Sequence, residues 1–182
     1  MDVKRLGLLA NALTVSRIVL SILLPFLPPL ETSFLVVYAV CGATDVLDGM
    51  LARKANAQSR LGARLDSAAD FVLAAAMLLS LYPVVKVPWE VLLFIAVIAG
   101  IRLASAAVSR MKYRAFASLH TYANKLTGIL LFLFPFSLKV WTPLVSVWIL
   151  CGVAALSATE ELLIQVRSKS LDLDRKSIFS KE

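Results

Sequence analysis

Long apolar stretches, separated by short polar or proline-containing segments, dominate this sequence. A stretch of roughly 17 to 25 predominantly apolar residues is long enough to cross a bilayer as an α-helix. Apolar residues make up 59% of the 182 residues, whereas soluble domains contain about 45–50%. The sequence therefore predicts an all-α integral membrane bundle of six transmembrane helices. The six stretches are residues 8–29, 33–52, 66–85, 89–110, 121–139 and 141–166.

The length of the chain is that of one compact domain. We expect a membrane domain over residues 1–166 and a cytoplasmic tail of mixed charge over 167–182. Cys41 and Cys151 both lie in apolar stretches, so we interpret them as buried apolar residues and not as a disulfide. The first apolar stretch continues without a signal-peptide cleavage pattern, and we predict that it is retained as the first helix.

Lysines and arginines are distributed unevenly between the stretches. Of these 19 residues, 15 fall in segments that six helices would place on one side of the membrane, and only Lys86 and Lys139 fall on the other. The positive-inside rule then predicts that both termini are cytoplasmic. We interpret the net charge of +7 as a consequence of this topology, with a tail near anionic lipid heads, and expect no nucleic acid partner.

Four of the 12 acidic residues lie at the predicted cytoplasmic ends of the second and third stretches. A charge near the centre of a membrane helix costs about 2.5–3.5 kcal/mol, so these residues require a compensating role. Asp45 and Asp48 are three residues apart and Asp66 and Asp70 are four apart, which places each pair on one helix face. Two facing pairs would supply the oxygen ligands that Mg²⁺ or Mn²⁺ prefers.

A purely structural role for these carboxylates is the alternative interpretation. They could form an ion-pair network that holds two helices together. The candidate partners are Arg53, Arg60 and Arg64. Small residues beside the carboxylates, including Gly49 and Gly62, would permit close helix packing, but they also leave room for a bulky ligand. This room favours a binding site, and we expect residues 55–64 to be its cytoplasmic connection.

The spacing of these residues resembles the signature of the CDP-alcohol phosphatidyltransferases. From Asp45 to Asp70 the chain reads D-x2-D-G-x2-A-R-x8-G-x3-D-x3-D, and every fixed position of that signature is matched. The pattern N-x-L-T-x2-R at residues 11–17 is similar to a segment that many members carry. The resemblance covers the first three stretches, and beyond about residue 75 only the hydropathy follows it.

This resemblance implies metal-dependent transfer of a phosphatidyl group from CDP-diacylglycerol to the hydroxyl of a small polar acceptor, with release of CMP. It implies two divalent cations, Mg²⁺ or Mn²⁺, at the cytoplasmic side of the cytoplasmic membrane, and is compatible with a homodimer. Asp70 would be a metal ligand, the general base, or both. The implied metal ligands are Asp45, Asp48, Asp66 and Asp70. The implied CDP-lipid site comprises Thr14, Arg17, Asp45, Gly49, Ala52, Arg53 and Gly62.

Basic residues near the predicted cytoplasmic ends of the fourth and fifth stretches are candidates for binding the acceptor. We predict this role for Arg102, Arg110 and Lys125, with glycerol 3-phosphate or another polyol phosphate as the acceptor. Ordinary positive-inside topology is the alternative interpretation. Arg102 lies within an apolar stretch, where a charge requires a partner.

Other classes of protein also use carboxylates in membrane helices. A CDP-choline or CDP-ethanolamine phosphotransferase acting on diacylglycerol is the alternative within the same family. Membrane prenyltransferases also use paired aspartates, but those motifs lie far apart in longer chains. A divalent-cation transporter could bind a permeating ion with four carboxylates, but it offers no role for the segment between the two aspartate pairs.

Overall fold

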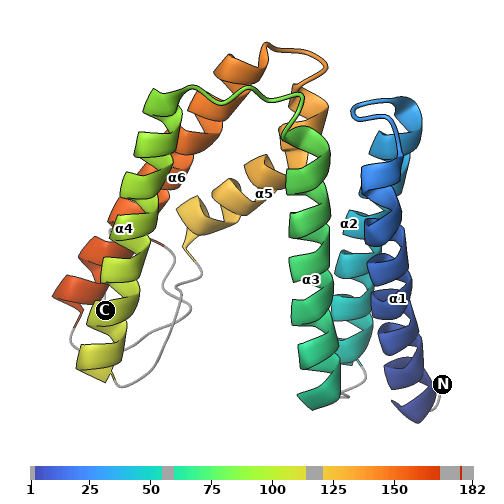
Figure 1. Ribbon diagram of the computed structural model, residues 1–182. Helices are drawn as coiled ribbons and strands as arrows, with labels where there is room; N and C mark the ends of the chain where they lie inside the picture. Colours follow the sequence, from blue (N-terminus) through green and yellow to red (C-terminus); the bar gives the residue numbers. More distant parts are fainter. Residues whose placement is uncertain (1–2, 55–59, 114–120, 169–176, 178–182) are drawn as a thin grey trace. The chain divides into compact units, whose positions relative to one another are not determined.

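The computed structural model describes residues 3–54, 60–113, 121–168 and 177. Within these residues the chain is all-α, with six α-helices and one short 3₁₀ helix (Figure 1). The elements are α1 (Val3–Leu23), η1 (Leu24–Phe26), α2 (Thr32–Lys54), α3 (Arg60–Leu81), α4 (Trp89–Tyr113), α5 (Tyr122–Ser137) and α6 (Pro143–Arg167). Each predicted apolar stretch corresponds to one helix, so the all-α class and the six helices are confirmed.

Four helical segments among the described residues are long and apolar enough to cross a membrane. They are Gly7–Phe26, Thr32–Leu51, Trp89–Tyr113 and Pro143–Arg167. Segments in the bilayer core are helical because lipid offers no hydrogen-bond partner for backbone N–H and C=O groups. A helix pairs these groups internally.

The first helix ends earlier than its hydropathy predicts. We expected it to continue to residue 29, but α1 stops at Leu23 and is followed by η1. Pro25 is the physical reason, because proline lacks the N–H that would continue the helical ladder and its ring clashes with the preceding turn.

The predicted connection over residues 55–64 is also wrong in part. Helix α3 already begins at Arg60, and only residues 55–59 of that segment lie outside the described part of the chain. The prediction followed hydropathy, which falls where charges begin. A helix can continue beyond that point, because its backbone hydrogen bonds do not depend on the apolar surroundings of its side chains.

The chain divides into two compact units, residues 1–86 and 87–182. In the first unit, α1 packs against both α2 and α3, and η1 contacts all three (Figure 1). Buried side chains on these helices include Leu24, Phe34, Cys41 and Ala69. A side chain on the inner face of α1 can therefore reach residues of both α2 and α3.

In the second unit, α6 packs against both α4 and α5. Its buried face carries Cys151 and Ile164 together with the polar residues Ser157, Glu161 and Gln165. Buried polar groups of this kind require partners within the unit. Both cysteines are buried and unbridged, as predicted.

Candidate active site

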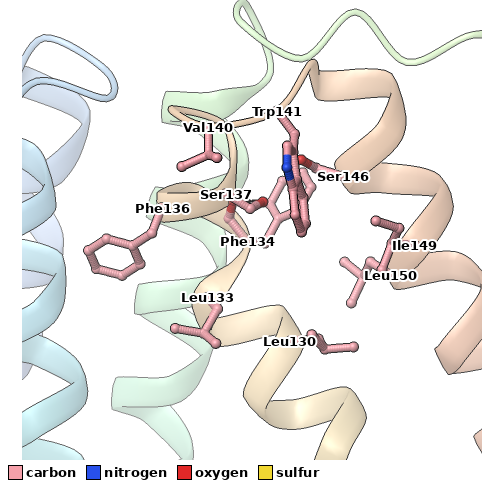
Figure 2. A pocket seen from close by; sticks show the side chains of 10 residues that line it. All are labelled: Leu130, Leu133, Phe134, Phe136, Ser137, Val140, Trp141, Ser146, Ile149 and Leu150. Carbon is pink, nitrogen blue, oxygen red and sulfur yellow. Dashed lines mark hydrogen bonds between the residues drawn. The ribbon is translucent and has the colours of Figure 1, made fainter.

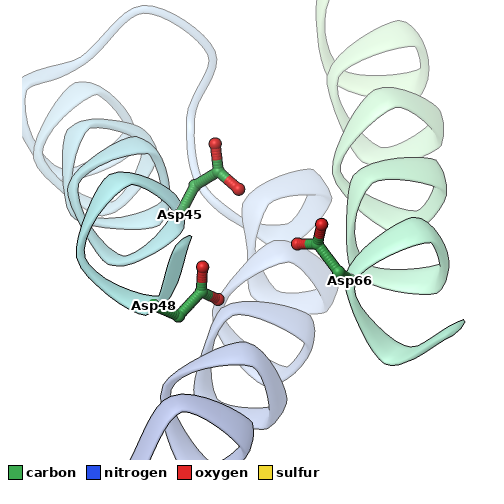
Figure 3. A group of neighbouring side chains, drawn as sticks. All are labelled: Asp45, Asp48 and Asp66. Atoms are coloured by element: carbon green, nitrogen blue, oxygen red, sulfur yellow. The ribbon is translucent and has the colours of Figure 1, made fainter. Parts of the chain in front are cut away.

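The carboxylates of α2 and α3 converge at one place in the first unit. Asp45, Asp48 and Asp66 each present an oxygen that lies within 4.8 Å of the other two (Figure 3). Asp48 is buried, whereas the side chains of Asp45 and Asp66 are about half exposed. Helical spacing places each pair on one face, and the packing of α2 and α3 on α1 brings the two faces together.

Arg17 of α1 contacts all four predicted metal ligands. Its Nη2 donates to Asp66 Oδ1 at 2.6 Å, and its Nη1 donates to Asp45 and, at 3.3 Å, to Asp70 Oδ1. Asp48 Oδ2 lies 3.7 Å from Nη2. The Arg17 side chain is fully buried, and its Nε has no hydrogen-bond partner among the described residues. Among the described side chains, the cation that pairs with these carboxylates therefore comes from α1.

The clustering of the carboxylates agrees with the metal-site interpretation, but their ion-pair partner among the described side chains was not anticipated by the structural alternative. The structural alternative paired the carboxylates with Arg53, Arg60 and Arg64, whereas the observed partner is Arg17. Arg64 is exposed, and the side chains of the other two lie outside the described part of the chain. The sequence contained one signal for this pairing, because Arg17 is a single charge in an apolar stretch and requires an acidic partner.

Thr14 supports the site from the same face of α1. Its buried hydroxyl lies 2.8 Å from Asp48 Oδ2 and 3.0 Å from the carbonyl oxygen of Ala10, and it can donate to either. Donation to Asp48 orients the carboxylate that is least accessible to water. Thr14 was predicted to line the nucleotide site, and the structure gives it a contact with a candidate metal ligand.

The donor set fits a hard divalent cation. All the candidate ligand atoms are carboxylate oxygens, which Mg²⁺ and Mn²⁺ prefer, and they already surround one cationic group, the Arg17 guanidinium. Among the side chains that the structure describes, four carboxylates and one guanidinium leave an excess of three negative charges. Such an excess in a partly buried place favours the binding of further positive charge.

The remaining residues of the predicted CDP-lipid site lie on the same two helices. Gly49 follows Asp48 on α2 and is half-buried, and Gly62 lies in the first turn of α3. Ala52 and Arg53 lie in the last turn of α2, but their side chains fall outside the described part of the chain.

The second unit contains the predicted acceptor residues. Arg102 Nη1 donates to Glu161 Oε2 at 3.0 Å, and Nη2 donates to Asn124 Oδ1 at 3.0 Å. Asn124 in turn donates to Glu161 Oε2 at 3.0 Å, and Ser157 also contacts both Arg102 and Asn124. Glu161 is buried, while the Arg102 side chain is 37% exposed. We call these four residues, Arg102, Asn124, Ser157 and Glu161, the Arg102 network.

The sequence predicted that Arg102 needs a partner but did not identify Glu161. The available signal was the acidic residue Glu161 inside an apolar stretch, where a charge requires a partner. Arg110 and Lys125, the other predicted acceptor residues, are exposed. Lys112, a neighbouring basic residue of α4, donates to the carbonyl oxygens of Gln165 and Val166, so it caps the end of α6.

We predict that Glu161→Ala destabilises the protein, because it leaves the Arg102 guanidinium without its counter-ion. Removing one member of a buried pair costs about 3–5 kcal/mol, and the partial exposure of Arg102 reduces this to roughly 2–3 kcal/mol. Denaturation by detergent would measure the loss. The control is the double variant Arg102→Met/Glu161→Leu, which removes both charges of the Arg102 network and should recover most of the stability. Wild-type stability in Glu161→Ala would contradict the assignment.

A separate apolar cavity of about 340 Å³ lies between the end of α5 and the start of α6 (Figure 2). Its lining includes Leu133, Phe134, Trp141 and Ile149, and none of its lining residues is charged. Ser146 also lines it, with a buried hydroxyl that has no hydrogen-bond partner in the described residues. The cavity offers no charged group for metal binding or acid–base chemistry, whereas the acidic cluster does, so the acidic cluster is the candidate active site.

The helices and the acidic cluster define a class of protein: a helical membrane protein in which two helices contribute carboxylates to one candidate metal site. The CDP-alcohol phosphatidyltransferase family model matches residues 7–159, so the chain belongs to this family of integral membrane enzymes. The match extends well beyond residue 75, where the resemblance of the motifs ended.

Two similar proteins are cardiolipin synthases (CMP-forming). The protein from Rattus norvegicus is 38% identical over 118 residues and the protein from Homo sapiens is 36% identical over 118 residues. In each case the aligned part covers 63% of this chain and 38% of the relative, so the match spans well under half of the relatives' length. No solved structure matches the chain.

Proposed function

We propose that this protein transfers a phosphatidyl group from CDP-diacylglycerol to the hydroxyl of a polar acceptor in a metal-dependent reaction that releases CMP. One observation carries the proposal: in a member of this family, carboxylates of α2 and α3 lie within 4.8 Å of one another and form an oxygen-only donor set. Four carboxylates that share, among the described side chains, one arginine are suited to binding divalent cations.

In this proposal Asp45, Asp48 and Asp66 hold two divalent cations, Mg²⁺ or Mn²⁺, and Asp70 acts as a ligand, as the general base, or as both. Bound divalent cations polarise phosphate oxygens and stabilise a departing phosphate. The acceptor oxygen forms a bond to the lipid-bearing phosphorus, the bond from that phosphorus to CMP breaks, and the hydroxyl proton passes to Asp70. Asp70 suits this role because its side chain, at 62% exposed, is the most accessible of the four.

The CDP-lipid site of the proposal follows the family signature. Small residues leave room beside the carboxylates, and the cations of Arg17 and Arg53 suit phosphate oxygens. The proposed residues are Thr14, Arg17, Asp45, Gly49, Ala52, Arg53 and Gly62.

Two acceptors are each supported by an observation. Basic residues of the second unit, Arg102, Arg110 and Lys125, favour glycerol 3-phosphate or another polyol phosphate. The similarity to cardiolipin synthases (CMP-forming) favours phosphatidylglycerol, since adding a phosphatidyl group to its free hydroxyl yields cardiolipin. The pairing of Arg102 with Glu161 weakens the case for a polyol phosphate, because a neutralised arginine attracts a phosphate dianion less strongly.

The proposed setting is a six-helix transmembrane domain over residues 1–166 with a cytoplasmic tail over 167–182, in the cytoplasmic membrane. Both termini and the active site would be cytoplasmic, and a homodimer is compatible with this arrangement. The distribution of lysine and arginine supports this topology.

The test is CMP release by the purified protein in lipid vesicles. With CDP-diacylglycerol, Mg²⁺ and the correct acceptor, we expect CMP and a new phospholipid in equal amounts. Glycerol 3-phosphate and phosphatidylglycerol are compared directly as acceptors. Product from CDP-choline and diacylglycerol, or uptake of divalent cations without CMP release, would contradict the proposal and favour the corresponding alternative class.

The same assay tests the acceptor residues. If a polyol phosphate is the acceptor, Arg110→Ala and Lys125→Ala should raise the KM for it with little change in the KM for the CDP-lipid, because each removes binding common to the ground and transition states. Unchanged acceptor kinetics in both variants would show that these residues do not bind the acceptor and that their charge reflects only the positive-inside rule.

A further inference from the structure

The Arg17 guanidinium occupies the centre of the acidic cluster. Its two Nη atoms contact oxygens of Asp45, Asp66 and Asp70, and its distance to Asp48 is also that of an ion pair. The side chain is fully buried, and all of its described ion pairs are with these carboxylates. The candidate metal ligands are therefore also the ligands of an internal cation.

Charge and geometry make the Arg17 guanidinium and the divalent metal ions competitors for the same carboxylates. Two divalent ions balance the four carboxylates completely, so an arginine in the same place would add an uncompensated buried charge. The carboxylate oxygens that accept N–H bonds from Arg17 direct lone pairs at the guanidinium, and such a lone pair cannot serve a metal at the same time. At separations of about 4 Å, charges near a protein surface interact strongly, so removing one of them should change the affinity of the site for another cation.

We infer that Arg17 is a built-in counter-ion that competes with the divalent cations for the acidic cluster, and that metal binding releases its guanidinium toward the pyrophosphate of the CDP-lipid. This inference rests on the proposed function. The Nε atom, which has no partner among the described residues, supplies a donor that the carboxylates leave unused. An arginine fork suits phosphate oxygens, so the released side chain would join the nucleotide site only when metal is present. Arg17 is thus a positioning residue that couples metal loading to lipid binding.

The experiment measures Mn²⁺ affinity by electron paramagnetic resonance in metal-stripped protein without CDP-lipid. We expect Arg17→Met to bind Mn²⁺ at least about tenfold more tightly than the wild type, because the competing cation is gone. Arg64→Met is the matched control, since Arg64 is an exposed arginine of α3. It should change the affinity by less than about twofold, because exposed charges are screened.

A second measurement tests the competition directly. Arg17→Ala removes the side chain and leaves space beside the carboxylates for a small cation. Added methylguanidinium at a non-denaturing concentration should then weaken Mn²⁺ binding to this variant competitively, with no effect on the wild type. A merely structural role for Arg17 predicts no such competition.

The wild type provides a readout that does not depend on the folding of a variant. With ¹⁵N-labelled arginine, the Arg17 Nε–H signal, assigned with Arg17→Lys, should shift when Mg²⁺ is added. No shift at saturating Mg²⁺, or a Mn²⁺ affinity in folded Arg17→Met equal to or weaker than that of the wild type, would overturn the inference alone. Absence of Mn²⁺ binding to the wild type would overturn the metal mechanism, and with it the proposed function.

Discussion

Asp66→Asn is expected to lower CMP release by at least about 10²–10³-fold while the protein still inserts and folds. An amide oxygen is neutral, so the variant loses one charged ligand from the group in which three carboxylate oxygens lie within 4.8 Å. Groups that stabilise developing charge on a reacting oxygen contribute this much to the rate. Asp45→Asn should behave in the same way. The measurements are initial rates in vesicles and Mg²⁺ binding to the metal-stripped protein.

The matched control for this prediction is Glu31→Gln, which neutralises an exposed carboxylate in the first unit away from the cluster. Its turnover should equal that of the wild type. Excess chelator should abolish wild-type activity, and added Mg²⁺ or Mn²⁺ should restore it. Full turnover in chelator would rule out the metal mechanism, whatever the aspartate variants show.

Asp70→Asn is expected to separate metal binding from proton transfer. If Asp70 takes the proton of the acceptor hydroxyl, the variant should bind metal and CDP-lipid nearly as the wild type does and lose a factor of about 10²–10⁴ in turnover. The geometry favours this outcome, because Asp70 makes the longest hydrogen bond to Arg17, at 3.3 Å, and lies outside the group of three closest carboxylates. Rates and binding are measured on the same preparation.

Two other outcomes of this experiment are informative. A parallel loss of Mg²⁺ affinity and turnover would assign Asp70 as a metal ligand. Normal turnover would exclude both roles. Asp66→Asn serves as the comparison, since it should lose metal and turnover together.

The class of protein, the helices and the acidic residues could all be predicted from the sequence. Apolar stretches long enough to cross a bilayer must be helical in lipid, because their backbone groups have no other partner. A charged residue in such a stretch indicates a functional site, because placing a charge in lipid is costly and such residues are retained mainly where they have a role. The spacing between Asp45 and Asp48, and between Asp66 and Asp70, is that of neighbours on a helix, so periodicity alone places each pair on one face.

Helix ends were less predictable because hydropathy records where lipid ends and not where helical hydrogen bonding ends. Pro25 ended α1 within an apolar stretch, and α3 began at Arg60 within a charged segment. In both cases a local backbone property prevailed over the apolar pattern.

Which charges meet depends on the tertiary fold. Arg17 pairs with residues 28 to 53 positions away, and Arg102 pairs with Glu161, 59 positions away. Periodicity shows which face of its own helix a side chain occupies but not which helix lies opposite, since that depends on how the helices pack. Here α1 packs against both α2 and α3, and α6 packs against α4. The partners of both arginines follow from these contacts.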